Sequence, residues 1–164
     1  MSVKELDEIG GRLLVVFDGH CGFCNHSVRW FLRRDREDRL RFVASTSPKV
    51  SELLALHGTG MQGLGAEPDS VVVVRDPGGA TERVFMRSDA AREMLRELPQ
   101  PWRFAGILLG WVPRPVRDFG YRLIARWRYR IWGRLEGCPL PTVGERARFL
   151  YLFALRCHGG DGKH

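Results

Sequence analysis

The sequence predicts an α/β domain with a helical C-terminal part. Over residues 11–98, short apolar runs alternate with segments of helical periodicity, as when strands are joined by helices. The segment 76–79, Asp-Pro-Gly-Gly, is strongly turn-forming and indicates a hairpin between two of these runs. From residue 99 onward the apolar spacing is helical. We therefore expect a single domain over residues 1–164, made of a core at 11–98, a helical extension at 99–157 and a polar tail at 158–164.

Four short runs in the core have the composition of strands. The first is apolar and bounded by glycine and aspartate, and the third is rich in β-branched valine. The turn at 76–79 joins the third run to the fourth. The expected strands are 13–17, 40–44, 71–75 and 82–86.

Helical patterns fill the segments between and after these strands. Ser47 and the pair Ser88-Asp89 are expected to cap the second and third helices, because short polar side chains accept hydrogen bonds from the first backbone N–H groups. The expected helices are 21–34, 48–57 and 90–98, and the glycine-rich segment 58–67 is expected to be a loop. The resulting order, β-α-β-α-β-β-α, is that of the thioredoxin fold.

The extension is expected to form three helices, at 101–109, 115–133 and 142–156. Thr142 and Glu145 form a capping box at the start of the last one. In the middle helix, apolar residues repeat at helical spacing and arginines fill the other positions. We expect this apolar stripe to face the core and the arginines to face outward. The stripe consists of Val116, Gly120, Leu123, Ile124, Trp127 and Ile131.

Two cysteines stand where the first strand meets the first helix. The strand ends in Asp18-Gly19-His20, and Cys21 and Cys24 follow as the helix begins. Helix N-termini and Cys-x-x-Cys pairs both lower thiol pKa values, and residues three apart share a helix face. Cys24 continues the apolar face of the helix, so we expect it in the core and Cys21 at the exposed tip. This predicts a redox-active pair in which Cys21 attacks and Cys24 resolves.

The motif Asp18-x-x-Cys21-x-x-Cys24-Asn25 after an apolar strand resembles the DCC family of thiol-disulfide oxidoreductases, which is named for these residues. The resemblance covers residues 11–142. It implies a thioredoxin-like fold and thiol-disulfide exchange, without giving the substrate. From the Cys-x-x-Cys pair we expect activity of the protein-disulfide reductase type. Further landmarks are Arg33-Arg34-Asp35-Arg36, Arg41-Phe42, Arg87-Ser88-Asp89-Ala90-Ala91, Pro113-Arg114-Pro115-Val116-Arg117-Asp118, Tyr121, Arg128-Tyr129-Arg130, Gly133 and Cys138.

Asp18 and His20 each allow a structural and a chemical role. Asp18 is expected to bond backbone N–H groups of the turn, and it is also placed to accept or relay the proton of Cys24. Its negative charge opposes thiolate formation nearby. His20 would stabilise a Cys21 thiolate when protonated, or simply occupy the turn.

Three more residues are supporting candidates. Asn25 belongs to the motif of the resembled family. Pro68 is the one candidate for a cis-proline before the third strand, or it is an ordinary loop proline. Cys138 matches a family cysteine and is either a third redox thiol or a small buried residue.

Two alternatives to redox chemistry remain open. A structural zinc site needs about four ligands, and here Cys138, Cys157, His20 and His26 are scattered and no second Cys-x-x-Cys occurs. A non-catalytic binding module is the other alternative, since arginines interleave with aromatic residues over 114–134. A helix with an arginine outer face explains that pattern more simply, so nucleic acid is not an expected partner.

Composition bounds the compartment and the partners. The net charge is +7, and the N-terminal segment 1–11 lacks the basic start and apolar stretch of an export signal. No apolar run reaches the ~18 residues that span a bilayer, and four cysteines do not form a disulfide scaffold. We expect a cytoplasmic protein without metal or organic cofactor that acts on a protein or a low-molecular-weight thiol or disulfide. The oligomeric state stays open.

Overall fold

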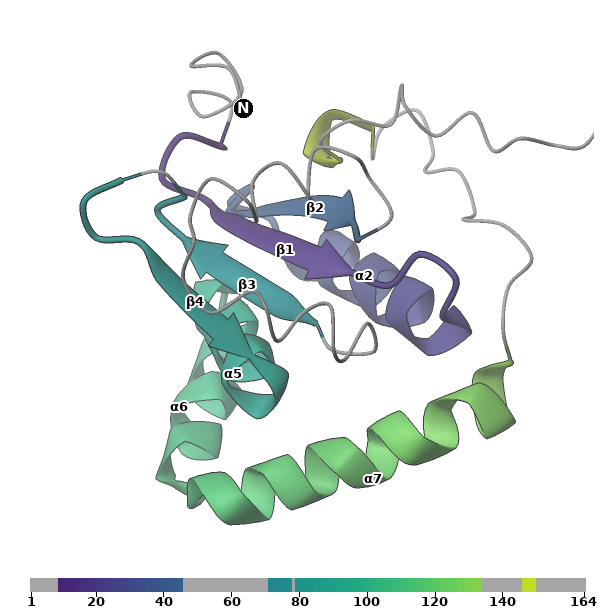
Figure 1. The fold of residues 1–164 in the computed structure, drawn as a ribbon. Coiled ribbons are helices and arrows are strands. Elements are labelled where there is room, and N and C mark those ends of the chain that lie inside the picture. The colour runs from purple at the N-terminus through teal and green to yellow at the C-terminus, as the bar shows by residue number, and fades with distance from the viewer. Residues whose placement is uncertain (1–8, 46–70, 78, 134–145, 150–164) are drawn as a thin grey trace, which may run out of the picture.

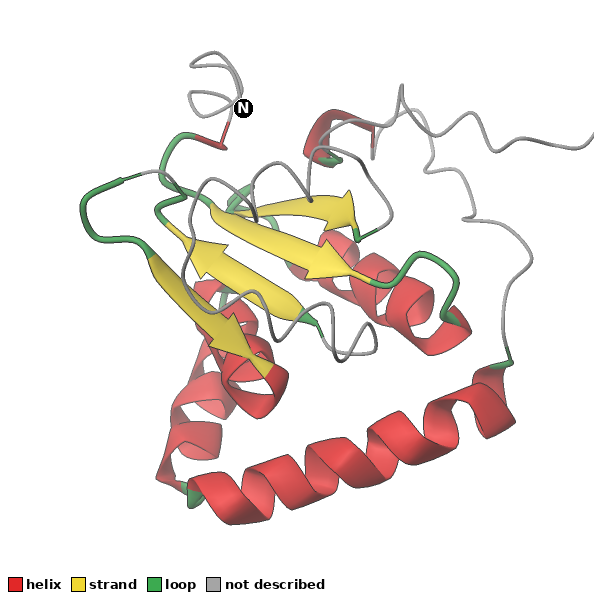
Figure 2. Ribbon diagram, in the orientation of Figure 1, coloured by secondary structure: helices red, strands yellow, loops and turns green. Residues whose placement is uncertain are grey.

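The computed structural model describes residues 9–45, 71–77, 79–133 and 146–149. Its centre is a four-stranded sheet of order β2-β1-β3-β4, shown in yellow in Figure 2. The strands are β1 (Leu13–Phe17), β2 (Leu40–Ala44), β3 (Val72–Arg75) and β4 (Arg83–Met86).

The pairing of the strands is that of a thioredoxin-like fold. β1 and β2 are parallel, with Val15 opposite Phe42. β3 is antiparallel to β1, and β4 is antiparallel to β3. The predicted fold class is therefore confirmed. The first two strands have the predicted bounds, and β3 and β4 each begin one residue later than predicted.

The sheet has a buried cluster on each face, because successive side chains of a strand point to opposite sides. Leu13, Val15 and Phe17 face α2 (Gly22–Arg34) and α5 (Arg87–Glu97), which pack on the same side of the sheet. Figure 1 shows both helices behind the strands. Leu14 and Val16 belong to the second cluster, on the other face.

Helix α5 begins earlier than predicted and without the predicted cap. It follows β4 directly, and Met86 is its N-cap residue with no side-chain hydrogen bond. Ser88 instead donates its hydroxyl hydrogen bond to Asp118, and Asp89 pairs with Arg117 at 3.0 Å. The prediction of a Ser88-Asp89 cap was wrong because these side chains tie α5 to α7 (Arg114–Trp132).

Helices α6 (Trp102–Trp111) and α7 form the described part of the extension. α6 packs against α5, and α7 packs against both α2 and α5 along one edge of the molecule (Figure 1). Both helices lie within a residue or two of their predicted bounds.

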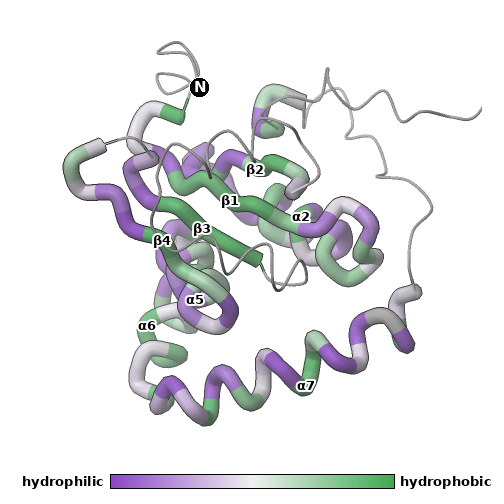
Figure 3. The backbone as a smooth tube through the Cα atoms, viewed as in Figure 1, coloured by the Kyte–Doolittle hydropathy of each residue, from purple (hydrophilic) through white to green (hydrophobic). Residues whose placement is uncertain are grey.

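The predicted orientation of α7 was wrong. Arg117 and Arg128 are buried, whereas the apolar residues of the predicted stripe are about half exposed, from Trp127 at 47% to Ile131 at 62%. Figure 3 shows the hydrophobic positions spaced along this helix. Polar contacts determine its orientation: Arg117 pairs with Asp89, and the Tyr121 hydroxyl accepts a hydrogen bond from the Val71 N–H at 3.2 Å. Hydrophobic spacing alone does not reveal such contacts.

The prediction of a last helix at 142–156 was wrong for the part of this segment that the structure describes. Arg146–Arg148 is a short 3-10 helix, η1. Phe149 then pairs as a parallel bridge with Phe42 on the outer side of β2, with its ring 5.8 Å from that of Phe42. Pairing to the edge strand explains why a continuous α-helix does not form here.

Several predicted segments lie outside the described residues. They are the helix at 48–57, the loop at 58–67, the rest of 142–156 and the tail at 158–164. The division of the chain into core, extension and tail therefore stays a prediction.

The first prediction concerns the contact between α2 and the end of α7. A Cβ atom on Gly22 would lie 2.5 Å from the backbone oxygen of Trp132, whereas one on Gly120 would meet nothing within 4 Å. Gly22→Ala should lower the free energy of unfolding by about 1–3 kcal/mol through overpacking. Gly120→Ala, the matched control inside a helix, should raise it by about 0.5–1 kcal/mol. Urea unfolding measures both, and equal changes would contradict the contact.

Candidate active site

Cys21 caps the N-terminus of α2 with its own thiol. It follows the turn after β1 and keeps an extended backbone, with φ −86° and ψ 116°. Its Sγ accepts a hydrogen bond from the Cys24 N–H at 3.2 Å, and its carbonyl accepts one from the Asn25 N–H at 3.0 Å. Sulfur thus occupies the position that a serine or aspartate oxygen usually takes at a helix start.

Both cysteines are free thiols and both are buried. Cys24 joins the core cluster as predicted. The predicted exposure of Cys21 was wrong, since none of its surface is accessible. Its thiol folds back over the first turn, and the next residue, Gly22, lies against the backbone of Trp132 at the end of α7. The ring of Phe23 also packs on that of Trp132, with centroids 5.0 Å apart.

The two thiols have pKa values shifted in opposite directions. The Cys24 side chain donates a hydrogen bond that, with its backbone N–H and the positive charge of Arg128, lowers the pKa of Cys21 from 9.0 to about 6, although burial and Asp18 oppose this. The same hydrogen bond, burial and the negative charge on Cys21 raise the pKa of Cys24 well above its ordinary value. At neutral pH the site therefore holds one thiolate, at Cys21, and one thiol, at Cys24.

Asp18 takes the structural role expected of it. Its Oδ1 accepts a hydrogen bond from the His20 N–H at 2.9 Å, and its carbonyl accepts one from the Cys21 N–H at 3.4 Å. Its charge raises the pKa of both cysteines. His20 is exposed in this turn. A proton-accepting role for Asp18 stays a prediction.

Asn25 fastens the turn to the helix. It is buried, and its Nδ2 donates to the carbonyls of Gly19 at 2.7 Å and Cys21 at 3.1 Å. The structure thus brings together Asp18, Cys21, Cys24 and Asn25. Pro68 and Cys138 lie outside the described residues.

Arg128 is the site residue that sequence reasoning placed wrongly. It was expected on the outer face of its helix, yet only 2% of it is exposed and its charge lowers the pKa of both cysteines. The helical spacing does place Arg117, Tyr121 and Arg128 on one helix face, beside the predicted apolar stripe.

An apolar cavity of about 230 Å³ lies beside Cys24. Residues of β1, α2, α5 and α7 enclose it, among them Phe17, Phe31, Met94 and Ile124, and Arg128 is part of its wall. Its lining is almost entirely apolar, which suits a small hydrophobic group next to the thiol pair.

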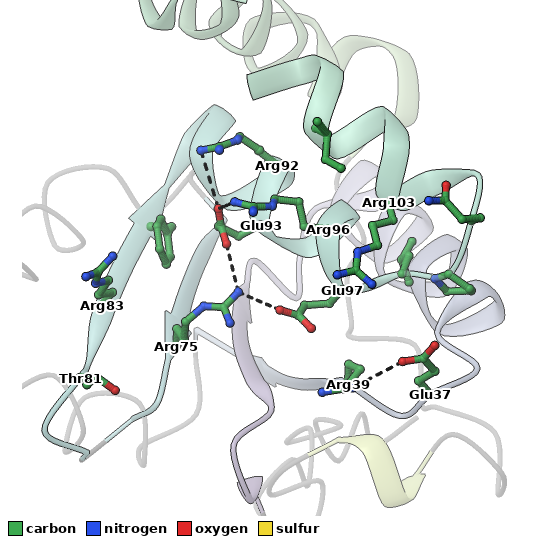
Figure 4. A pocket seen from close by; sticks show the side chains of 15 residues that line it. Glu37, Arg39, Arg75, Thr81, Arg83, Arg92, Glu93, Arg96, Glu97 and Arg103 are labelled. Carbon is green, nitrogen blue, oxygen red and sulfur yellow. Dashed lines mark hydrogen bonds and ion pairs between the residues drawn. The ribbon is translucent and has the colours of Figure 1, made fainter. Parts of the chain in front are cut away.

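A larger and strongly charged cavity of about 940 Å³ lies at the other end of the sheet, where β3 ends and β4 begins (Figure 4). Six arginines and three glutamates line it, and most are paired with one another. Arg75, for example, lies 3.1 Å from Glu93 and 2.8 Å from Glu97. No cysteine lines this cavity, so it is separate from the thiol pair.

The described residues contain no group of three histidine, cysteine, aspartate or glutamate side chains that could hold a metal ion. None of the helices in the described ranges is long and apolar enough to cross a membrane.

A Cys-x-x-Cys pair at the first helix of a thioredoxin-like sheet is typical of thiol-disulfide redox proteins. The family model of DCC1-like thiol-disulfide oxidoreductases matches residues 15–134, and the chain belongs to this family. It is 34% identical over 144 residues to the uncharacterized protein YuxK of Bacillus subtilis, covering 88% of this chain and 97% of YuxK. It is 30% identical over 129 residues to a chloroplastic DCC family protein of Arabidopsis thaliana, covering 79% and 70% of the two chains. No solved structure matches the chain.

The second prediction tests the charge of Arg128. Arg128→Gln should raise the pKa of Cys21, and well below that pKa the alkylation rate should fall about tenfold for each unit of rise. Arg128→Lys should keep part of the effect because it keeps the charge. Arg29→Gln, an exposed change on α2, is the control. Iodoacetamide rates across pH measure the effect, and a wild-type profile in Arg128→Gln would contradict it.

Proposed function

We propose that this protein exchanges thiols and disulfides with a protein or low-molecular-weight partner, with Cys21 as the attacking and Cys24 as the resolving thiol. The observation that carries the proposal is the position of the Cys21 sulfur at the start of α2, 3.2 Å from the Cys24 backbone nitrogen that donates to it. In keeping with this, the pKa of Cys21 is lowered and that of Cys24 is raised. A thiolate is the reactive nucleophile, and family membership supports the same class of chemistry.

The reaction has two steps. The Cys21 thiolate attacks one sulfur of a substrate disulfide, that bond breaks, and the other substrate sulfur leaves as a thiolate. The mixed disulfide is then attacked by the sulfur of Cys24 after it loses its proton. A Cys21–Cys24 disulfide forms and the second substrate sulfur is released, so that two electrons have passed to the substrate.

The site supplies a reason for this order. In the reduced state, the hydrogen bond to the Cys21 thiolate and the charge of that thiolate help to keep Cys24 protonated. Both contributions disappear when Cys21 becomes part of a mixed disulfide, so the pKa of Cys24 should fall at the moment its thiolate is needed. We assign Asp18 as the acceptor of this proton, because its charge acts on both thiols.

The burial of Cys21 bears on how a substrate reaches the thiol pair, and the cavity beside Cys24 bears on the kind of substrate. Because Cys21 is fully buried, a substrate sulfur reaches it only after neighbouring residues move, and exchange should depend on that opening. The apolar cavity beside Cys24 favours a substrate with a hydrophobic group next to its disulfide. We assign the protein to a reducing compartment such as the cytoplasm, where a thiol pool can regenerate the pair.

The third prediction is tested with an aromatic disulfide that releases a coloured thiol. The reduced wild-type protein should release two thiols per Cys21–Cys24 pair and keep no adduct. Cys24→Ser should release one and keep a stable mixed disulfide at Cys21, because the serine hydroxyl still donates to the thiolate but cannot resolve the adduct. Cys21→Ser should react slowly, and the double variant gives the background of Cys138 and Cys157. Peptide mapping locates each adduct, and trapping mainly in Cys21→Ser would reverse the assigned roles.

A further inference from the structure

Helix α7 presents to solvent an apolar face that the thiol chemistry does not use. We call this face, made of Val116, Phe119, Leu123, Trp127 and Ile131, the outer stripe. These side chains are 47% to 67% exposed, and their spacing places them on one side of the helix. On α6, Phe104, Leu108 and Trp111 are exposed as well, Trp111 at 83%. Exposed apolar surface on this scale marks an interaction site.

The same helices carry most of the excess positive charge of the chain. Residues 102–132 contain seven arginines and one aspartate, against a net charge of +7 for the whole chain. The aspartate, Asp118, accepts a hydrogen bond from the Ser88 hydroxyl of α5. Exposed arginines border the outer stripe at 122, 126 and 130, and the Arg130 guanidinium lies 5.7 Å from the centroid of the Trp127 ring.

A binding partner of the outer stripe has to match both its apolar surface and its positive charge. A second copy of the chain would bring arginine-bordered stripes together with no carboxylate from the stripe to offset the repulsion. An anionic lipid surface supplies phosphate groups for the arginines and acyl chains for the apolar side chains. A lipid surface also needs no groove of matching shape, so it can bind a helix that forms an edge of the molecule (Figure 1).

We propose that the outer stripe docks this protein onto an anionic lipid surface, with α7 lying in the plane of the headgroups. The helix has 19 residues and is therefore about 28 Å long, and none of the described helices can span a bilayer. The inner face of α7 holds Arg128, and Ile124 lines the cavity beside Cys24, so docking would hold the thiol pair about one helix diameter from the lipid. The docking itself does not depend on the proposed redox function.

The fourth prediction is tested by flotation of the full chain with two kinds of vesicle, phosphatidylcholine alone and phosphatidylcholine mixed with phosphatidylglycerol. The protein should float with the anionic vesicles and be released by high salt. Vesicles with brominated acyl chains should quench the tryptophan fluorescence of the wild-type protein, so this measurement needs no variant. Leu123→Gln with Trp127→Gln should reduce binding at least tenfold, because the apolar burial is lost. Both positions are about half exposed, and circular dichroism checks the fold.

A charge variant and a matched control complete the experiment. Arg122→Gln with Arg126→Gln should weaken binding to anionic vesicles about 30-fold at low salt. Arg29→Gln with Arg33→Gln removes the same charge from exposed positions of α2 and should have little effect. The proposal is overturned if the protein floats with neither vesicle, if the control loses as much binding as the α7 variant, or if sedimentation finds a dimer that Leu123→Gln with Trp127→Gln converts to a monomer. A lack of vesicle binding would not change the result of the disulfide assay, and a lack of disulfide exchange would not change vesicle binding.

Discussion

The chemistry of this site depends on the hydrogen bonds that Cys24 donates to the sulfur of Cys21. They exist because α2 begins immediately after Cys21, which places the Cys24 N–H 3.2 Å from Sγ. Asn25 holds the preceding turn in place through the carbonyls of Gly19 and Cys21. A thiolate held in this way stays buried, whereas a buried charge without such donors would take up a proton instead.

Helix α7 makes that burial electrostatically possible. Its inner face carries a buried guanidinium, Arg128, toward the thiols, and its end packs on Gly22. Polar contacts with α5 hold the helix in this orientation, namely Arg117 with Asp89 and Asp118 with Ser88. One helix therefore has two functional faces: a charged inner face that supports the thiolate, and an apolar outer face left for a lipid surface.

The sequence was sufficient for features that local periodicity controls. The four strands, the start of α2 and the core position of Cys24 follow from apolar spacing and turn chemistry, and the structure agrees. The exposure of Cys21 and the orientation of α7 were predicted wrongly because both are decided by contacts between distant segments, such as Gly22 with Trp132. For α7, a prediction from hydrophobic spacing also assumes that arginine side chains face solvent. Phe149 is a similar case, since pairing with Phe42 overrides a local helical pattern.

The most direct test of this account is a residue-resolved titration of the reduced protein, by NMR of isotope-labelled cysteine. We expect Cys21 to titrate with a pKa of about 6 and Cys24 to remain protonated through its ordinary value of 9.0. A pKa of Cys21 near 9.0, or a Cys24 that ionises before Cys21, would contradict the claim that the hydrogen bonds donated by Cys24 hold a thiolate at Cys21.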